Sequence, residues 1–309
     1  MTPEIHAFVL CHAGSVRSNN EDNYYLQHRI RTCVEQKIDS ADYAGAPRTF
    51  LAAVADGMGG AERGEAASLA AVRALRPASF RHMRRAAQAS VRAANDEICA
   101  QMRALGARMG STLTALYISG DRALCSNLGD SRIYLLRGGA LTRLTRDHNR
   151  AQQLVDLGVL TPEQAQRHPA RHELTRHLGI LPEEMALEPE LGPEMQLEAG
   201  DRFLLCSDGL CDGVTEAQIA EALEGGGTPQ RQAEALVERA LAGGSRDNVT
   251  AMVVHIRDKM GWGSWTRATI RNMSRSLGCG RSRTSSERGA SARCSSWSGR
   301  TSGSPTGRR

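Results

Sequence analysis

The chain has 309 residues, of which 40% are hydrophobic, so it can bury one sizeable core or two small ones. Its formal net charge of +5 comes from residues 258–309, which hold 11 basic and 2 acidic residues, while residues 1–257 hold 28 basic and 32 acidic ones. No run of about 18 apolar residues occurs, and the N-terminus is polar and lacks a basic start, which argues against a membrane span and a signal peptide.

Seven segments are predicted to be β-strands because they are β-branched or apolar and are bounded by Gly, Asp or Asn. The sequence SNLGDSR separates two of them, so we expect this pair to form a hairpin with Gly129–Asp130 at its turn. In chain order, the predicted strands are residues 5–12, 49–55, 113–119, 123–128, 133–136, 202–206 and 249–256.

Helices are predicted from apolar residues at helical spacing and from the Thr-x-x-Gln pattern of a capping box. Strands come in adjacent pairs and so do helices, which argues against regular βαβ winding. We therefore expect an α+β fold in which antiparallel sheets are covered by pairs of helices. The helical stretches are residues 83–102 and 233–241, and the capping boxes are Thr161 with Gln164 and Thr215 with Gln218.

Four aspartates, Asp56, Asp130, Asp208 and Asp247, each lie at the end of a predicted strand or in a turn beside one. An uncompensated carboxylate deep in a core is costly and tends to protonate. For any one of them a turn or cap is the ordinary explanation. The four together, with few basic neighbours, favour a divalent cation. Because no His or Cys belongs to the cluster, Mg²⁺ or Mn²⁺ fits it better than Zn²⁺.

The glycine-rich stretch after Asp56, residues 57–60, would let backbone carbonyls and waters approach the same ion, although a plain tight turn is the alternative. No Lys-Ser/Thr follows it, which excludes a P-loop. Near the N-terminus, Glu21 and Asp22 add further oxygens. Arg17 is a planar donor suited to a pair of phosphate oxygens, although such an arginine is more often an ordinary surface residue.

Eight short motifs follow one another along residues 5–256: GSVRSNNEDN, VADGMGG, MGSTLTAL, NLGDSRIYLL, LTRDHN, LTRHLG, DRFLLCSDGLCDGV and SRDNVTAMVV. In this order they resemble the type 2C metal-dependent protein serine/threonine phosphatases, the PPM family, in its bacterial branch. The resemblance implies an αββα sandwich, with two antiparallel sheets between helix pairs, over residues 1–257.

The resemblance also implies metal ligands. Asp56 would bridge two ions, Mn²⁺ or Mg²⁺, and Gly57 would bind one of them through its backbone carbonyl. Asp208 and Asp247 would hold the other. Asp130, together with Asp208, would form a third and weaker site.

The remaining residues would act around that centre. Glu21 and Asp22 would act on metal-bound waters, and Arg17 would hold the substrate phosphate. A bridging hydroxide would then hydrolyse phosphoserine or phosphothreonine in proteins, with Arg17 and Asp56 as catalytic residues. The substrates expected from the resemblance are phosphoproteins of a bacterial Hanks-type kinase, and type VI secretion components are a weaker expectation.

Some features depart from the family pattern or stay open. Met58 stands where many eukaryotic relatives have a histidine, and His177 stands where we expect a small residue, so we predict a surface position near a substrate flap for His177. His148 is expected to organise the turn before a helix. The flap itself is expected within about residues 148–193.

Two other functions remain open, a non-catalytic pseudophosphatase that only binds, and a different two-metal phosphohydrolase. The eight cysteines form no Cys-x-x-Cys pair, so we expect a reduced, cytoplasmic protein. Residues 258–309 are rich in Ser, Gly and Arg, which predicts a disordered basic tail. Through its charge alone this tail could bind nucleic acid, and a reading-frame shift is an alternative origin for it.

Overall fold

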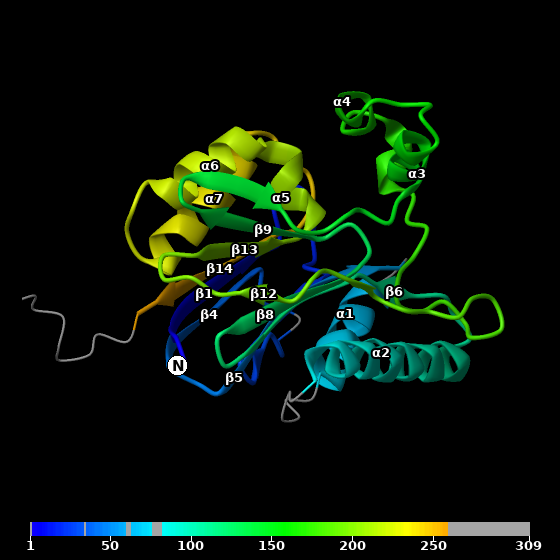
Figure 1. Cartoon of the computed structure of the whole chain (residues 1–309). Coiled ribbons are helices and arrows are strands. Elements are labelled where there is room, and N and C mark those ends of the chain that lie inside the picture. The colour runs from blue at the N-terminus through cyan, green and yellow to red at the C-terminus, as the bar shows by residue number, and fades with distance from the viewer. Residues whose placement is uncertain (1, 34, 60–62, 76–81, 259–309) are drawn as a thin grey trace, which may run out of the picture. The chain divides into compact units, whose positions relative to one another are not determined.

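The computed structural model describes residues 2–33, 35–59, 63–75 and 82–258, all within the unit Met1–Lys259 (Figure 1). The predicted tail lies outside the described residues except for Asp258, as does Gly60 of the glycine-rich stretch. In the described part of the chain, no helix is long and apolar enough to cross a membrane.

The first antiparallel sheet has six strands in the order β10-β9-β13-β14-β1-β4. Strand β1 alternates in the way a two-faced strand should, with Ile5, Val9 and Cys11 facing the other sheet and Phe8 facing a helix layer. The strands are β1 Glu4–His12, β4 Ile38–Gly45, β9 Arg132–Arg137, β10 Ala140–Arg143, β13 Arg202–Cys206 and β14 Val249–Arg257.

The second sheet has eight strands, with β11-β8-β7-β5-β2-β3 in order, β12 paired to β8 and β6 paired to β5. Its central strand β5 is almost entirely buried because it has a packed layer on each face. The strands are β2 Asp22–Leu26, β3 Arg29–Ile30, β5 Thr49–Met58, β6 Gly110–Ser111, β7 Leu113–Ser119, β8 Arg122–Leu128, β11 Glu190–Leu191 and β12 Met195–Gln196.

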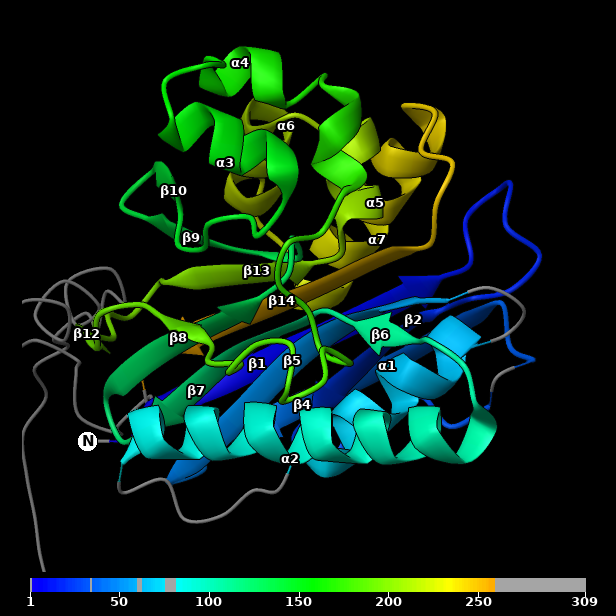
Figure 2. The same ribbon diagram turned by 90° about the vertical axis from the view of Figure 1, so that its right-hand side faces the viewer.

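Helices cover the outer face of each sheet, and Figure 2 shows the two helix layers on opposite sides of the strands. Helices α1 (Arg63–Ala74) and α2 (Met83–Leu105) pack on the eight-stranded sheet, and the predicted stripe of α2 is the side that is buried. Helices α5 (Asp208–Gly213), α6 (Glu216–Glu224) and α7 (Pro229–Ala242) pack on the six-stranded sheet. The predicted αββα sandwich is therefore confirmed.

A separate helical segment follows β10 and stands above the edge of the sandwich (Figure 1). It contains α3 (Arg150–Asp156), α4 (Pro162–Ala165) and a 3₁₀ turn (Pro169–His172). The predicted capping boxes at Thr161 and Thr215 open α4 and α6. We call residues 148–193 the flap segment below.

The predicted hairpin around Gly129–Asp130 is wrong. Leu128 at the end of β8 pairs with Leu113 of β7, whereas Arg132 at the start of β9 pairs with Cys206 of β13. The chain therefore crosses here from one sheet to the other. Both strands are buried on both faces, so the sequence carried no alternation that could assign them to one sheet or to two.

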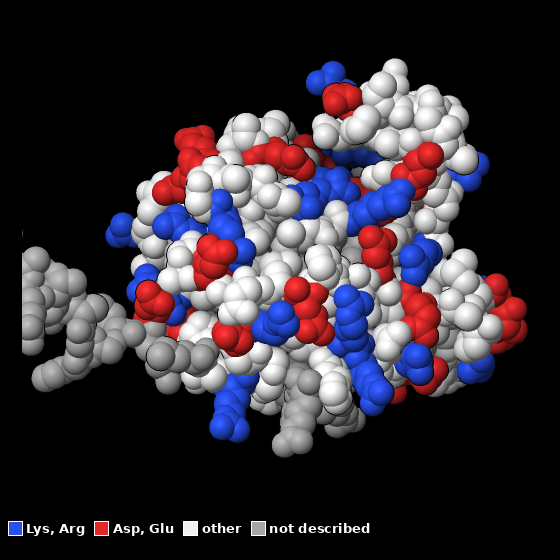
Figure 3. Space-filling view, in the orientation of Figure 1, with Lys and Arg blue, Asp and Glu red and all other residues white. Residues whose placement is uncertain are grey.

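The six cysteines among the described residues are free thiols. Acidic and basic side chains are interspersed on the face shown in Figure 3, and neither sign covers it alone. On this face, the surface gives no sign of the broad basic patch that nucleic-acid binding requires.

Candidate metal centre

The centre of the site is a pair of carboxylates on neighbouring strands. Asp22 opens β2 and lies directly opposite Asp56 of β5 in the antiparallel register. Strand β5 continues two residues beyond Asp56, further than predicted. Thr112 fixes the backbone there: its Oγ1 accepts the N–H of Asp56 at 2.9 Å, and its N–H donates to the carbonyl of Asp56 at 2.8 Å.

Asp22 is fully buried, and its two oxygens differ. Oδ2 accepts hydrogen bonds from Ser207 Oγ and from Thr250 Oγ1, both at 2.7 Å. Oδ1 is also buried and has no hydrogen-bond partner in the protein. Burial, opposed by those two hydroxyls and reinforced by nearby carboxylates, raises the pKa of Asp22 to about 7. A buried acceptor without a donor is unusual and indicates a place for a cation.

Asp208 reaches the same place from the other sheet, as the first residue of α5 after β13. Burial alone would raise its pKa, but the interactions with His172 and Asp56 bring the pKa below its ordinary value. Burial and then the charges of Asp22 and Asp208 raise the pKa of Asp56. The pKa values of the two carboxyls thus shift in opposite directions because the groups lie close together in a buried place.

Asp247 lies in the loop before β14, and both of its carboxylate oxygens are engaged. Arg17 Nη2 donates to Oδ2 at 2.8 Å, and the N–H of Asn248 donates to Oδ1 at 2.8 Å. The side chains of Arg17 and Asp247 are 50% and 37% exposed, so this rim ion pair contributes little to stability. Arg17, predicted to hold the substrate phosphate, is thus paired with Asp247, which is predicted to bind metal.

Asn248 joins the N-terminal loop to β14. Its Oδ1 accepts the N–H of Glu21 at 2.8 Å, and its Nδ2 donates to the carbonyls of Ala13 and Asn19 at 2.8 and 2.9 Å. Sequence reasoning did not single out this residue, because an asparagine after an aspartate has the composition of an ordinary turn. It positions the segment that carries Arg17 and Glu21.

Close approach of three backbone segments explains Gly57. Its N–H donates to the carbonyl of Glu21 at 3.1 Å. A Cβ at this position would lie 2.0 Å from the carbonyl oxygen of Gly64 and 2.7 Å from that of Glu21. Gly57 belongs to β5 and not to a turn, so the tight-turn alternative does not apply to it. Burial raises the pKa of the half-buried Glu21 carboxyl beside it.

Asp130 lies in the crossing between β8 and β9, where it is buried. Burial, followed by the charges of Asp208 and Asp147, raises its pKa well above the ordinary range. His148 holds this crossing: its Nδ1 accepts the N–H of Gly129 at 3.2 Å, and its own N–H donates to the carbonyl of Gly129 at 2.9 Å. The charge of Asp208 therefore acts on Asp130, and the third metal site at these two residues stays a prediction.

Two other histidines lie near these residues. His172 was not singled out, yet its Nδ1 is 3.8 Å from Asp208 Oδ2, and its interaction with this carboxylate raises its pKa. No feature of the surrounding sequence could have identified it. His177, predicted to lie at the surface, is half-buried, and a Cβ on Gly110 would lie 2.9 Å from its Nδ1 and 3.2 Å from Met58 Cε.

The donor set suits a hard divalent cation, since it consists of carboxylates with a backbone carbonyl close by. Among the described residues, however, no three His, Cys, Asp or Glu side chains already enclose a metal-sized space. Two of the carboxylates have partners within the protein: Arg17 donates to one oxygen of Asp247, and Asp208 interacts with Asp56 and His172. Metal binding would have to replace the contacts made by Arg17 and His172.

Comparison with known proteins identifies the family of this chain. A family model described as protein phosphatase 2C matches residues 37–228. The serine/threonine protein phosphatase PstP of Mycobacterium tuberculosis is 41% identical over 253 residues, which is 79% of this chain but only 44% of that relative. The chain thus spans less than half the length of that protein.

A serine/threonine phosphatase named stp from Listeria innocua is 30% identical over 262 residues, covering 81% of this chain and 95% of that protein. Among solved structures, the catalytic domain of PstP in complex with two manganese ions superposes with a TM-score of 0.66 at 38% identity, covering 82% of this chain and all of that one. The chain belongs to the protein phosphatase 2C family.

Proposed function

We propose that the chain hydrolyses phosphoserine and phosphothreonine in proteins, with Mn²⁺ or Mg²⁺ as the cofactor. The observation that carries the proposal is the meeting of Asp22, Asp56 and Asp208 from separate segments, with the buried Oδ1 of Asp22 lacking a donor. Family membership and the manganese complex of PstP support the choice of reaction and of metal.

In this proposal Asp56, the backbone carbonyl of Gly57, Asp208 and Asp247 would hold two divalent ions, with Asp56 shared between them. Asp130 adds a third, weaker site. When bound, such ions supply a water of lowered pKa and positive charge for the phosphate.

The chain's own residues do the rest. Glu21, half-buried beside Gly57, and Asp22, anchored by two hydroxyls, hold their oxygens where they can accept protons from water. Arg17 is half exposed at the rim of the site. Once released from Asp247, its guanidinium can donate to two phosphate oxygens at once.

The partners remain part of the proposal. We expect phosphorylated substrates of a bacterial Hanks-type kinase, and type VI secretion components only as a weaker prediction. A cytoplasmic location is supported by the six free thiols of the described residues. Binding of nucleic acid by residues 258–309 stays a prediction, which DNA retention of the full chain against residues 1–257 would test.

Phosphate release from a phosphothreonine peptide, with Mn²⁺ and with chelator, tests the proposal. We expect release only with metal, and its loss in Asp208→Asn. Asp39→Asn is the matched control, because Asp39 is a half-buried carboxylate that accepts a hydrogen bond from Tyr24 Oη at 2.9 Å in a different part of the structure.

Two outcomes would favour the other functions. Faster cleavage of a phosphodiester than of the phosphothreonine peptide would favour the other two-metal hydrolase. Absence of both activities, together with no heat of Mn²⁺ binding, would favour the pseudophosphatase.

A further inference from the structure

Two thiols stand side by side next to Asp208, and the proposed reaction makes no use of them. Cys206 ends β13 and Cys211 lies in α5, and their Sγ atoms are 3.8 Å apart. A disulfide needs about 2.05 Å between its sulfur atoms, so closing this bond requires an approach of about 1.7 Å. The two residues are separated by Ser207 and the first turn of α5, so closing the bond requires a shift at the start of this helix.

Cys211 differs chemically from the other thiols of the core. Burial raises the pKa of Cys11 and that of Cys125 to about 12, so both stay protonated. A hydrogen bond from Cys206, with the nearby charge of Arg132, outweighs burial at Cys211 and lowers its pKa to about 7. The thiolate is the reactive form of cysteine, so Cys211 is the activated member of the pair.

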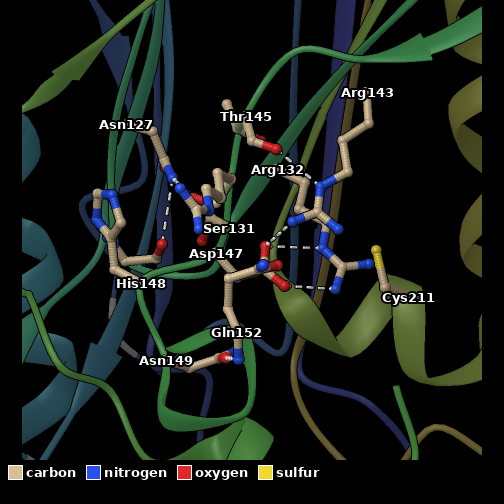
Figure 4. A network of polar contacts seen from close by, with 12 residues as sticks. Asn127, Ser131, Arg132, Arg143, Thr145, Asp147, His148, Asn149, Gln152 and Cys211 are labelled. Atoms are coloured by element: carbon tan, nitrogen blue, oxygen red, sulfur yellow. Dashed lines mark hydrogen bonds and ion pairs between the residues drawn. The ribbon is translucent and has the colours of Figure 1, made fainter. Parts of the chain in front are cut away.

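A rigid network keeps the positive charge of Arg132 beside this sulfur. Arg132 donates to both oxygens of Asp147, from Nε at 3.0 Å and from Nη2 at 2.6 Å, and Arg143 donates to Asp147 at 2.7 Å. Tyr134 Oη lies 3.3 Å from Arg132 Nη1 and 3.9 Å from Cys211 Sγ. Figure 4 shows the sulfur of Cys211 facing the guanidinium of Arg132.

Small molecules can reach Cys211. A cavity of about 530 Å³ lies between the flap segment and α5, and Cys211 lines it together with Arg132 and Asp208. The cavity is far larger than a hydroperoxide group requires. Cys206 is fully buried behind Cys211, so a reagent entering through the cavity meets Cys211 first.

We propose that Cys211 is a hydroperoxide-reactive thiol and that Cys206 resolves it, so that the two form a reversible disulfide. The thiolate of Cys211 attacks one peroxide oxygen, the O–O bond breaks, and the leaving oxygen takes up a proton as water or alcohol. The sulfur of Cys206 then attacks the sulfenic sulfur of Cys211 and releases water. The two thiols give up two electrons to the peroxide, and a dithiol reductant restores them.

The disulfide would act on the metal centre through the residues between its ends. Asp208 lies between the two cysteines, and Ser207 donates from Oγ to Asp22 Oδ2 at 2.7 Å. Drawing α5 towards β13 would move Asp208 and would strain the hydrogen bond from Ser207 to Asp22. Displacing a positioning group by about 1 Å can reduce turnover about a hundredfold. This loss of activity rests on the proposed phosphatase function, whereas formation of the disulfide does not.

The test uses the full chain with three other cysteines replaced, as Cys33→Ser, Cys279→Ser and Cys294→Ser. The protein is treated without metal with hydrogen peroxide, freed of peroxide by catalase, alkylated and digested with trypsin. Cleavage after Arg202 and Arg231 leaves both thiols on one peptide, residues 203–231. We expect this peptide to lose two hydrogen atoms and to escape alkylation, and dithiothreitol should reverse both changes. Phosphothreonine-peptide hydrolysis with Mn²⁺ should fall about a hundredfold and recover likewise.

Single replacements identify the roles of the two thiols. Cys211→Ser should keep its basal activity and lose its sensitivity to peroxide, and Cys206→Ser should accumulate a sulfenic acid that dimedone traps. Two alkylated thiols after peroxide treatment would overturn the proposal, as would a disulfide that leaves phosphatase activity unchanged. If the protein has no phosphatase activity before peroxide treatment and still forms the disulfide, the proposed function is wrong and the proposed thiol reaction is supported.

Discussion

Asn248 offers a quantitative test of how the N-terminal loop is held at the metal centre. Replacing it with alanine removes one hydrogen bond accepted from Glu21 and two donated to the carbonyls of Ala13 and Asn19. At about 1 kcal/mol for each bond, the free energy of unfolding should fall by about 3 kcal/mol. Urea unfolding in the presence of a chelator measures this loss without a contribution from metal binding.

The same replacement should weaken Mn²⁺ binding about ten- to a hundredfold in titration calorimetry, because residues that position ligands have effects of this size. Asn95→Ala is the matched control. Asn95 is buried, and its side chain bonds Gly179 N–H at 2.8 Å and the carbonyl of Ile180 at 3.0 Å. It should lose about 2 kcal/mol of stability and keep its metal affinity. Equal Mn²⁺ affinity in the two variants would refute the reasoning.

Three further changes have defined outcomes. Gly57→Ala should lose about 3 kcal/mol in urea unfolding, because its Cβ would overlap the carbonyl of Gly64, and an unchanged midpoint would contradict this. Arg17→Ala should leave the free energy of unfolding within about 0.5 kcal/mol of the unchanged protein and raise KM for a phosphopeptide about tenfold. The variant should bind Mn²⁺ at least as tightly, since Asp247 loses its arginine partner. Weaker Mn²⁺ binding would contradict this prediction. Burial and nearby cations lower the pKa of His255 to about 4, so between pH 6.5 and 4 the unfolded chain binds more protons than the folded chain. The free energy of unfolding should therefore fall by about 2 kcal/mol as the pH drops through this window. The urea midpoint of His255→Gln should fall less over the same range.

Sequence patterns were sufficient where local chemistry decides the structure. The bounds predicted for β7 and β13 are those observed, because both are apolar runs closed by polar or turn-forming residues. Strand β4 (Ile38–Gly45) was missed because it lies at a sheet edge and carries polar residues. Helix α1 was missed because its alanine-rich sequence has little contrast between its faces. The crossing at Gly129–Asp130 depends on which distant strand each segment pairs with, and no local pattern records that.

The site residues likewise fall into those that local sequence could predict and those that only the fold brings together. Asp56 and Asp208 could be found because a carboxylate that follows an apolar run is conspicuous in a sequence. The interaction between Asp56 and Asp208, and the buried oxygen of Asp22 that lacks a hydrogen-bond partner, depend on two sheets meeting and could not be foreseen. His172 comes from the flap segment, so only the folded chain reveals that it lies beside Asp208.

The measurement that tests the central claim most directly is an anomalous difference map, recorded at the manganese edge, from crystals grown with Mn²⁺. The account predicts peaks in contact with Asp56, Asp208 and Asp247, with Arg17 turned away from Asp247. A map without peaks at these carboxylates, in crystals saturated with Mn²⁺, would contradict it.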